Sequence, residues 1–427
     1  MDTARWLELG EPLAALRLGG RRGVLTLLGL ALLAAWTGHQ GAVFLLLGLL
    51  ALAGTARLWA DRALLAVEGR HELIEDRAFP GESLRLRLVA VNEKALPLAW
   101  LRVRSAIPPA LTPPDAPRRW PYSERGGYLQ GMSALAWYSR AAWEFELPCR
   151  SRGVYRVGPL ELTSGDPFGF FTQRALLSER ATVLVYPRVV PLRRLGFPLA
   201  AGLGASQRRR ALQDDPSRAA GVRAYRPGDP LRRIHWKATA RQGELQVRVL
   251  EPAAAPQLLL VLAADTFDFP WTRYREDLFE LAVSALASIA WRALEDGWQV
   301  GLLANSPQPA RLPPASSPGQ LGLALEALAR VEPSSRLTVA QLLAEQPASG
   351  GRAATYVLAA GRTTVALRLA LERLAAARRP MVLLYGDEPP TGGARLPAYR
   401  LRQWDDLAAT LEGPGEIVGS PVMSPES

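Results

Sequence analysis

Three side chains of types that enzymes use in catalysis lie within one short segment, YRPGDPLRRIHWKATAR at 225–241. Asp229 supplies a carboxylate, His235 an imidazole, and Arg241 a guanidinium that could hold an anion. Together they could move protons at a substrate and stabilise a developing negative charge, as an enzyme pocket does. A nucleic-acid-binding patch and a buried structural clamp could have the same composition. The segment therefore has three competing interpretations, and the rest of the chain has to separate them.

The remaining nucleophiles and metal-ligating residues give catalysis little support. The other histidines, His39 and His71, and the single cysteine, Cys149, are distant in sequence, so no triad can be assigned. The metalloprotease, phosphate-loop and nucleophile-elbow motifs are absent from the sequence. Cys149 lies in a strand-like run and is expected to be structural, and one cysteine excludes an internal disulfide. We therefore expect no catalytic residue, no metal ligand and no cofactor.

The local signals in this segment indicate a turn followed by a short helix. Asp229 is placed as the helix N-cap and Pro230 as the first helical residue. Leu231, Ile234 and Ala238 then fall on one apolar stripe, with the basic residues largely off it. On this interpretation Asp229 has a structural role.

A strand, LQVRVLE, follows the helix, with apolar residues alternating on one face. Arg248 lies on the other face of this strand, and Glu251 is expected to form an ion pair with Arg248 or Arg232. Trp236 and Tyr225 could stack on bases, but an aromatic beside a helix stripe is more often a core residue. The segment is thus predicted to be a turn–helix–turn–strand unit.

Most of the formal net charge of +11 is concentrated around this unit. Between 188 and 250 there are fourteen Arg and Lys residues against four Asp and Glu, an excess of ten. Such a surface attracts anionic lipid headgroups, an acidic protein or nucleic acid. A solvated or lipid-facing basic surface is the first expectation, an acidic protein partner the second, and nucleic acid is not expected.

Two apolar runs near the N-terminus, 24–37 and 42–60, predict a membrane anchor. The first is short for a span of about 20 residues, and the second ends with Arg57 and Trp59, which suit a membrane interface. We favour a tight two-helix hairpin over a single signal anchor followed by a buried helix. Arginines flank both ends of the pair and none lies in the connection, so the positive-inside rule places the soluble part in the cytoplasm.

The remaining chain changes from a strand pattern to a strand–helix pattern. From about 64 to 190 the apolar residues alternate, which predicts a β-sandwich, interrupted at 108–140 by a partner-binding or poorly ordered insertion. From 257 apolar strands alternate with helices, which predicts a doubly wound α/β domain. The expected α+β multidomain organisation is a membrane hairpin at 1–63, a β-sandwich-like domain at 64–195, a flexible loop plus the turn–helix–strand unit at 196–256, the α/β domain at 257–411 and a disordered tail at 412–427.

The turn–helix–strand unit resembles the signature of a bacterial membrane-protein family known as domain of unknown function 58. That family's pattern is close to R-x-Y-x-x-G-D-x-x-R-x-I-x-W-x-x-[ST]-A-R, followed by L-x-V-R and a glutamate. RSRGVYRVGPLEL, SGDPFGFF and two N-terminal apolar helices are also similar to the family, so the resemblance extends over most of the chain. The matching positions that we expect to be structural or partner-binding are Arg223, Tyr225, Gly228, Asp229, Arg232, Ile234, Trp236, Arg241, Arg248 and Glu251.

The C-terminal alternation resembles the von Willebrand factor A fold, which often follows this signature. The metal site of that fold uses D-x-S-x-S after the first strand, whereas here the strand continues into LAADTFD. Asp265 comes two or three residues late and no serine pair follows it. The resemblance therefore implies a binding scaffold without a working metal site.

The family resemblance also implies a partner, because members are frequently encoded beside MoxR-type AAA+ ATPases. Our hypothesis is a non-enzymatic, two-pass protein of the cell (inner) membrane with cytoplasmic soluble domains. It would act as an adaptor or assembly factor for such an ATPase in envelope biogenesis or stress response. One alternative is an enzyme acting on an envelope precursor, with Asp229, His235 and Arg241 in a pocket. Another is an anionic-ligand or nucleic-acid binder that uses the basic patch.

Overall fold

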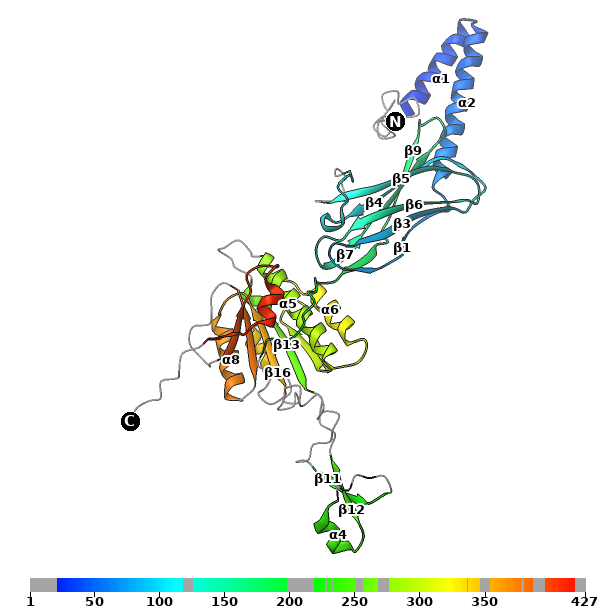
Figure 1. Cartoon of the computed structure of the whole chain (residues 1–427). Helices are drawn as coiled ribbons and strands as arrows, with labels where there is room; N and C mark the ends of the chain where they lie inside the picture. The colour runs from blue at the N-terminus through cyan, green and yellow to red at the C-terminus, as the bar shows by residue number, and fades with distance from the viewer. Residues whose placement is uncertain are drawn as a thin grey trace. The chain divides into compact units, whose positions relative to one another are not determined.

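The computed structural model divides the chain into two compact units, Met1–Val185 and Tyr186–Ser427 (Figure 1). We describe each unit by itself. The residues that the structure describes are 21–117, 126–197, 219–226, Asp229, Leu231, 234–250, 256–267, 276–335, 337–345, 354–377, 380–386 and 396–418. Part of the expected insertion at 108–140, most of the expected loop from 196 and most of the tail from 412 lie outside the described residues.

Unit 1 starts with two consecutive helices, α1 (Arg21–Trp36) and α2 (Gln40–Ala63). Gly38 lies between them with φ 78°, a left-handed conformation that glycine adopts without a steric penalty. Among the described residues, α2 is the one helix long and apolar enough to cross a membrane, and α1 is shorter. At its C-terminal end α2 buries Ala56, Ala60 and Ala63, which share one face of the helix. This alanine face allows strands β8 and β9 to pack closely on α2.

The rest of unit 1 consists of short strands in three sheets. The sheets have the orders β1-β3-β6, β2-β10-β7 and β5-β4-β8-β9, and every pairing is antiparallel except β2 with β10. The strands are β1 (Val67–Leu73), β2 (Arg77–Ala78), β3 (Ser83–Asn92), β4 (Leu98–Ile107), β5 (Gly127–Leu135), β6 (Arg140–Pro148), β7 (Gly153–Val157), β8 (Leu160–Gly165), β9 (Thr172–Leu177) and β10 (Ala181–Val185), with a 3-10 turn at Pro109–Leu111.

One hydrophobic core is shared by the three sheets of unit 1. The alternation in β3 directs Leu84, Leu86 and Leu88 into this core, as the sequence predicts, while Arg85 and Arg87 face outward. Cys149 is also fully buried in it, and burial raises the pKa of its thiol to about 11. The cysteine is therefore a packing residue in the described structure.

A hydrogen bond between His71 on β1 and Ser105 on β4 links two of the sheets through their interior. Nε2 of His71 lies 2.8 Å from Oγ of Ser105. Nδ1 of His71 is buried and has no hydrogen-bond partner in the described part of the chain. Burial lowers the pKa of His71 to about 4, so the imidazole is neutral at physiological pH.

Unit 2 is built on a seven-stranded sheet with the order β15-β14-β13-β16-β17-β18-β19. The strands β14, β13, β16, β17 and β18 are parallel, and β15 and β19 are antiparallel edge strands. The strands are β13 (Gln257–Ala263), β14 (Gln299–Ala304), β15 (Ala310–Ala315), β16 (Thr355–Ala360), β17 (Met381–Tyr385), β18 (Leu396–Arg400) and β19 (Glu416–Val418).

Helices cover both faces of this sheet, as the apolar run of β13 predicts (Figure 1). Alternate residues of β13, such as Val261, pack in the core beneath α7 and α8. Leu260 points to the opposite face, where α5 contacts β13 and β14. The helices are α5 (Glu276–Glu295), α6 (Gln320–Arg330), α7 (Val339–Ala344), α8 (Val365–Ala376) and α9 (Leu407–Glu412).

The segment 186–197 packs on this α/β domain, although the sequence assigns it up to 195 to the β-sandwich-like domain. The amide of Val190 donates to Oγ of Ser288 at 2.9 Å, and the carbonyl of Gly196 accepts from the Tyr399 hydroxyl at 2.9 Å. The Phe197 ring packs edge-on against Tyr399 with centroids 5.1 Å apart. The compact β unit ends at Val185, because these long-range contacts belong to unit 2.

The partly buried imidazole of His71 predicts a pH dependence of unit 1. Its pKa is about 4 in the folded chain and about 6.5 unfolded, so its contribution is complete above pH 6.5 and is lost as the pH falls toward 4. The total loss is of the order of 3 kcal/mol. Urea unfolding of the detergent-solubilised chain, followed by hydrogen exchange of β1 and β4, should show this loss. His71→Gln should remove it and the matched His235→Gln should not; an unchanged profile in His71→Gln contradicts the account.

Candidate functional site

The segment with the acidic, imidazole and guanidinium groups folds as a small unit of two strands and one helix, here called the signature unit. It comprises β11 (Ala219–Ala224), α4 (Trp236–Gln242) and β12 (Gln246–Leu250). β11 pairs antiparallel with β12, and Ile234 forms an additional bridge with Val247. Ile234 and Val247 are both buried and form the small apolar centre of the unit.

The carboxylate of Asp229 is held by three N–H donors. Nη1 and Nη2 of Arg223 donate to its two oxygens at 2.7 Å each, and the amide of Arg226 donates at 2.9 Å. These hydrogen bonds, that from Arg223 first, lower the pKa of Asp229 to about 2. A carboxylate this acidic and this fully engaged is a poor proton acceptor at neutral pH. It instead closes the turn that follows β11.

The prediction that Asp229 caps the helix is wrong. α4 begins at Trp236, and its N-cap is His235, whose Nδ1 accepts a hydrogen bond from the Ala238 amide at 3.0 Å. The amide of His235 also donates to the Gln246 carbonyl at 2.7 Å, which fixes the start of the helix against β12. Arg223 makes a two-point, charge-assisted hydrogen bond to the Asp229 carboxylate, which is therefore held at the turn and not at the start of α4.

The three groups of the hypothetical pocket are not joined to one another in the described part of the chain. Arg241 lies in the last turn of α4, with its side chain exposed. Within the described residues, no hydrogen bond or ion pair joins any two of Asp229, His235 and Arg241. The described geometry therefore gives no assembled acid–base site.

The other predicted signature residues are partly described. Tyr225 is half-buried, and its amide donates to the Leu245 carbonyl at 2.8 Å, which continues the pairing of β11 with β12. Gly228, Arg232 and Glu251 lie outside the described residues, as does the side chain of Arg248, whose backbone belongs to β12. The expected ion pair of Glu251 falls outside them too.

Trp236 is exposed, which corrects its predicted place in the core. The side chains of Trp236 and Leu231 are each 68% exposed, although Leu231 was expected on the buried stripe. The reason is size: α4 has two turns and buries none of its own residues, and Ile234 and Val247 fill the little space between it and the strands. The signature unit therefore carries exposed large apolar side chains beside the exposed cations Arg226, Lys237 and Arg241.

A second polar cluster lies where β13 and β14 end, the edge of a parallel sheet at which ligands often bind. The Asn305 side chain accepts from the Ala264 amide at 2.6 Å and donates to Oδ1 of Asp265 at 2.7 Å and to the Leu337 carbonyl at 2.8 Å. Burial raises the pKa of Asp265. The sequence analysis missed Asn305, although a polar residue directly after a buried parallel strand is a usable signal.

This cluster is internally satisfied. Thr266 donates its hydroxyl to the Ala263 carbonyl at 2.6 Å and accepts from the Gly361 amide at 2.8 Å, which ties β13 to β16. Among the described residues there is no group of three or more His, Cys, Asp or Glu that could hold a metal ion. The described groups at this edge brace the loops that leave the sheet.

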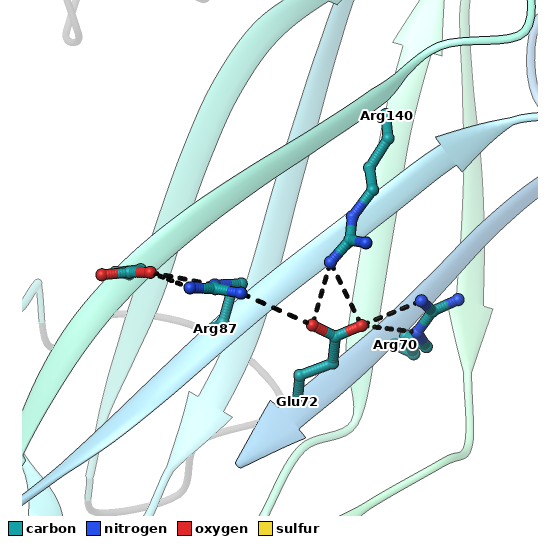
Figure 2. Close-up of polar contacts among 5 residues, drawn as sticks. Arg70, Glu72, Arg87 and Arg140 are labelled. Atoms are coloured by element: carbon teal, nitrogen blue, oxygen red, sulfur yellow. Dashed lines mark hydrogen bonds and ion pairs between the residues drawn. The ribbon is translucent and has the colours of Figure 1, made fainter. Parts of the chain in front are cut away.

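A third polar cluster crosses the outer face of the sheet β1-β3-β6 (Figure 2). Glu72 pairs with Arg70 at 2.8 Å, with Arg140 at 3.0 Å and with Arg87 at 4.0 Å, and Arg87 also pairs with Glu144. The register places Glu72 opposite Arg87 and Arg87 opposite Glu144. Exposed pairs of this kind stabilise a fold only slightly, and the opposite charges largely compensate each other. The cluster is a cross-strand ladder.

The His71–Ser105 pair has the atom spacing of a nucleophile and its base, and no sequence motif indicated it. Ser105 is fully buried, however, and His71 is partly buried, which lowers its pKa to about 4. A substrate could not reach the hydroxyl without opening the core. The signature unit therefore remains the candidate site, and its exposed groups are suited to binding.

Comparison with known proteins agrees with the sequence resemblance over part of the chain. A family model described as "Protein of unknown function DUF58" matches residues 221–383, which include most of the signature unit and the sheet as far as β17. The uncharacterized protein YeaD of Bacillus subtilis is 24% identical over 251 residues. The match covers 58% of this chain and 58% of that relative's length. Neither description gives an activity.

The similar solved structures do not extend the argument. A CARDB domain from Pyrococcus furiosus is 13% identical, covers 28% of this chain and 91% of its own, and has a TM-score of 0.19. The Pseudomonas fluorescens alkylpurine DNA glycosylase AlkC is 13% identical, covers 36% and 41%, and also scores 0.19. A mutant beta-glucosidase from Listeria innocua is 15% identical, covers 29% and 16%, and scores 0.17. Scores this low bear on neither fold nor function.

The two hydrogen bonds from Arg223 to Asp229, here called the clamp, predict that Asp229→Asn loosens the turn around them. An amide cannot accept both guanidinium bonds, so hydrogen exchange around 223–229 should become faster. Glu244→Gln, which changes an exposed carboxylate of the same unit, is the matched control. In the parent chain the protection should be complete above pH 3.8 and should fall as the pH approaches 2, because protonation releases the clamp. Equal exchange in the two variants, measured by mass spectrometry, would contradict the assignment.

The hydrogen bonds of Asn305 at the ends of β13 and β14 predict that Asn305→Ala destabilises unit 2 by about 2–3 kcal/mol, because the change leaves buried groups without hydrogen-bond partners. Ser306→Ala, which removes one hydroxyl bond to the Gln308 carbonyl, should cost less. Chemical unfolding of the two variants side by side measures the difference. A loss for Asn305→Ala no larger than that for Ser306→Ala would show that the cluster does not brace the fold.

Proposed function

We propose that this protein is a membrane-anchored, non-enzymatic adaptor that presents its signature unit to a protein partner. The supporting observation is the contrast within that unit: Asp229 is occupied by Arg223, while Trp236 and Leu231 are exposed. Exposed tryptophan and arginine are the residue types that most often dominate protein–protein binding energy. A protein partner that covers Trp236 and Leu231 would remove their apolar side chains from water, which favours binding.

The partner that we propose is a MoxR-type AAA+ ATPase, as the family resemblance implies. The unit's exposed cations favour a partner with an acidic surface, through long-range attraction and faster association. The adaptor would serve envelope biogenesis or a stress response, in which an ATPase acts on membrane-associated clients.

The anchor is proposed to be a two-helix hairpin in the cell (inner) membrane. The length and apolar composition of α2 support a span, and α1 would be its shorter partner. Arg57 and Arg62 near the end of α2, with arginines before α1, support a topology with both ends in the cytoplasm. The soluble units would then be cytoplasmic.

The proposed architecture is a β-sandwich in unit 1 and a von Willebrand factor A-like domain in unit 2. The single core shared by the three sheets supports the first. The strand order of unit 2 supports the second, because the chain places β14 on one side of β13 and then β16, β17 and β18 on its other side. The proposed domain is a binding scaffold, because its edge residues Asp265 and Asn305 hydrogen-bond each other.

An anionic-ligand binder remains the second candidate, because Arg226, Lys237 and Arg241 are exposed on the same unit. Binding carried by these cations alone would weaken steeply with salt and would not need Trp236. No described feature favours the enzyme acting on an envelope precursor.

A pulldown from detergent-solubilised membranes tests the adaptor. The intact chain should recover an AAA+ ATPase, and Trp236→Ala should weaken its recovery by about tenfold or more, the effect of losing a hot spot. The matched control is Trp137→Ala, which removes a similarly exposed tryptophan, 65%, from unit 1. The proposal fails if no ATPase is recovered, or if the two variants recover it equally.

A further inference from the structure

The turn between β8 and β9 presents two phenylalanines to the outside of unit 1. The side chains of Phe168 and Phe170 are 59% and 53% exposed, and their rings stack with centroids 5.9 Å apart. Pro167 and Gly169 beside them are exposed as well. Exposed single apolar residues are ordinary, but a stacked pair at the tip of a turn marks a surface that binds something apolar.

The turn holds these rings outward by hydrogen bonds. The buried Asp166 carboxylate accepts from the Phe168 amide at 2.9 Å and from the Phe171 amide at 2.6 Å. Its carbonyl accepts from the Trp100 indole at 3.1 Å and from the Gly169 amide at 3.2 Å. Gly169 has φ 77°, a conformation that a larger residue adopts only with strain. The exposure is therefore built into the turn.

The turn is also fixed to the end of α2 (Figure 1). The Arg57 guanidinium lies 5.6 Å from the centroid of the Phe171 ring, and Nε2 of Gln173 donates to Oδ1 of Asp61 at 3.0 Å. Ala60 is fully buried on the face of α2 that meets β8 and β9. Phe171, which directly follows Phe170 in the chain, thus lies beside Arg57, the first charged residue after the apolar body of α2.

We propose that Phe168 and Phe170 enter the interfacial layer of the same bilayer that α2 spans, and so form a second membrane contact of unit 1. This inference rests on the proposed membrane anchoring. An arginine at the end of a spanning helix extends its guanidinium to the headgroup level, so Arg57 places the adjoining turn at that depth.

The chemistry of the turn fits this layer. From Pro167 to Phe171 it is apolar, and its one carboxylate, Asp166, is buried and hydrogen-bonded. The turn adjoins Arg57 and exposed Arg174, which attract anionic headgroups. Leu58, which follows Arg57 on α2, is exposed as well. Two contacts, helix and turn, would fix the orientation of the strands of unit 1 relative to the bilayer surface.

Depth-dependent fluorescence quenching tests this contact. The full chain, reconstituted in phosphatidylcholine–phosphatidylglycerol vesicles, carries an environment-sensitive dye on Phe168→Cys or, in a second preparation, Phe170→Cys. Cys149 stays in place, because its thiol is buried with a pKa of about 11, and the parent chain measures background labelling. Leu47→Cys in α2 reports the anchor itself, and Glu146→Cys, exposed on β6, is the aqueous control.

The inference predicts that the dyes at 168 and 170 are quenched by nitroxides at the headgroup level, about twofold or more above the dye at 146. The dye at 47 should be quenched by nitroxides deeper in the acyl chains. Quenching at 47 with both turn dyes behaving like the dye at 146 overturns the inference and leaves the anchor intact; the turn would then lie in water or on a protein. No quenching at 47 overturns the anchor and the inference together.

Discussion

The two-point hydrogen bond between the Arg223 guanidinium and the Asp229 carboxylate decides what the signature unit can offer. It joins the end of β11 to the turn that precedes α4, and it engages the Asp229 carboxylate that the enzyme hypothesis needed as a base. His235 in turn caps α4, so the imidazole also has a structural task. Asp229 and His235 thus both accept hydrogen bonds within the unit. The exposed groups that the described part of the unit offers to a partner are the Trp236 indole and the cations.

Polar side chains also organise other loops and turns of the chain. Asp166 organises the β8–β9 turn through two backbone amides, and Asn305 holds Asp265 and the strand ends of unit 2. In each case polar side chains are turned inward to satisfy buried donors and acceptors, as a low-dielectric interior requires. Where they do so in a short turn, large apolar residues such as Phe168 or Trp236 are left on the outside. Rigid turns that display aromatic rings are economical binding devices, because little conformational entropy is lost on binding.

Much of this architecture could be predicted from periodicity. The alternating Leu84, Leu86 and Leu88 identified a half-buried strand, and the uninterrupted apolar run of β13 identified a strand covered on both faces. These patterns work because burial repeats with the geometry of the strand itself. The order of strand and helix in unit 2 followed for the same reason.

The failures came from contacts that local sequence rules do not include or from the size of an element. Asp229 satisfied the local rule for a helix cap, but Arg223 competes for the same oxygens and a local rule contains no such competitor. Trp236 was expected to be buried, but a two-turn helix on a two-stranded sheet has too little interior to hold it. The sequence pattern of 186–197 is that of a strand end followed by a loop. Its hydrogen bonds with Ser288 and Tyr399 show that it packs on the α/β domain of unit 2.

Photo-crosslinking from the signature unit in intact cells tests the central claim most directly. A benzophenone amino acid in place of Trp236 samples what touches this position, with the same residue in place of Trp137 as the reference. The account predicts one dominant protein adduct at 236, identified by mass spectrometry as an AAA+ ATPase and absent at 137. Adducts at 236 only to nucleic acid or lipid, or no adduct above that at 137, would contradict the claim that this unit exists to bind a protein.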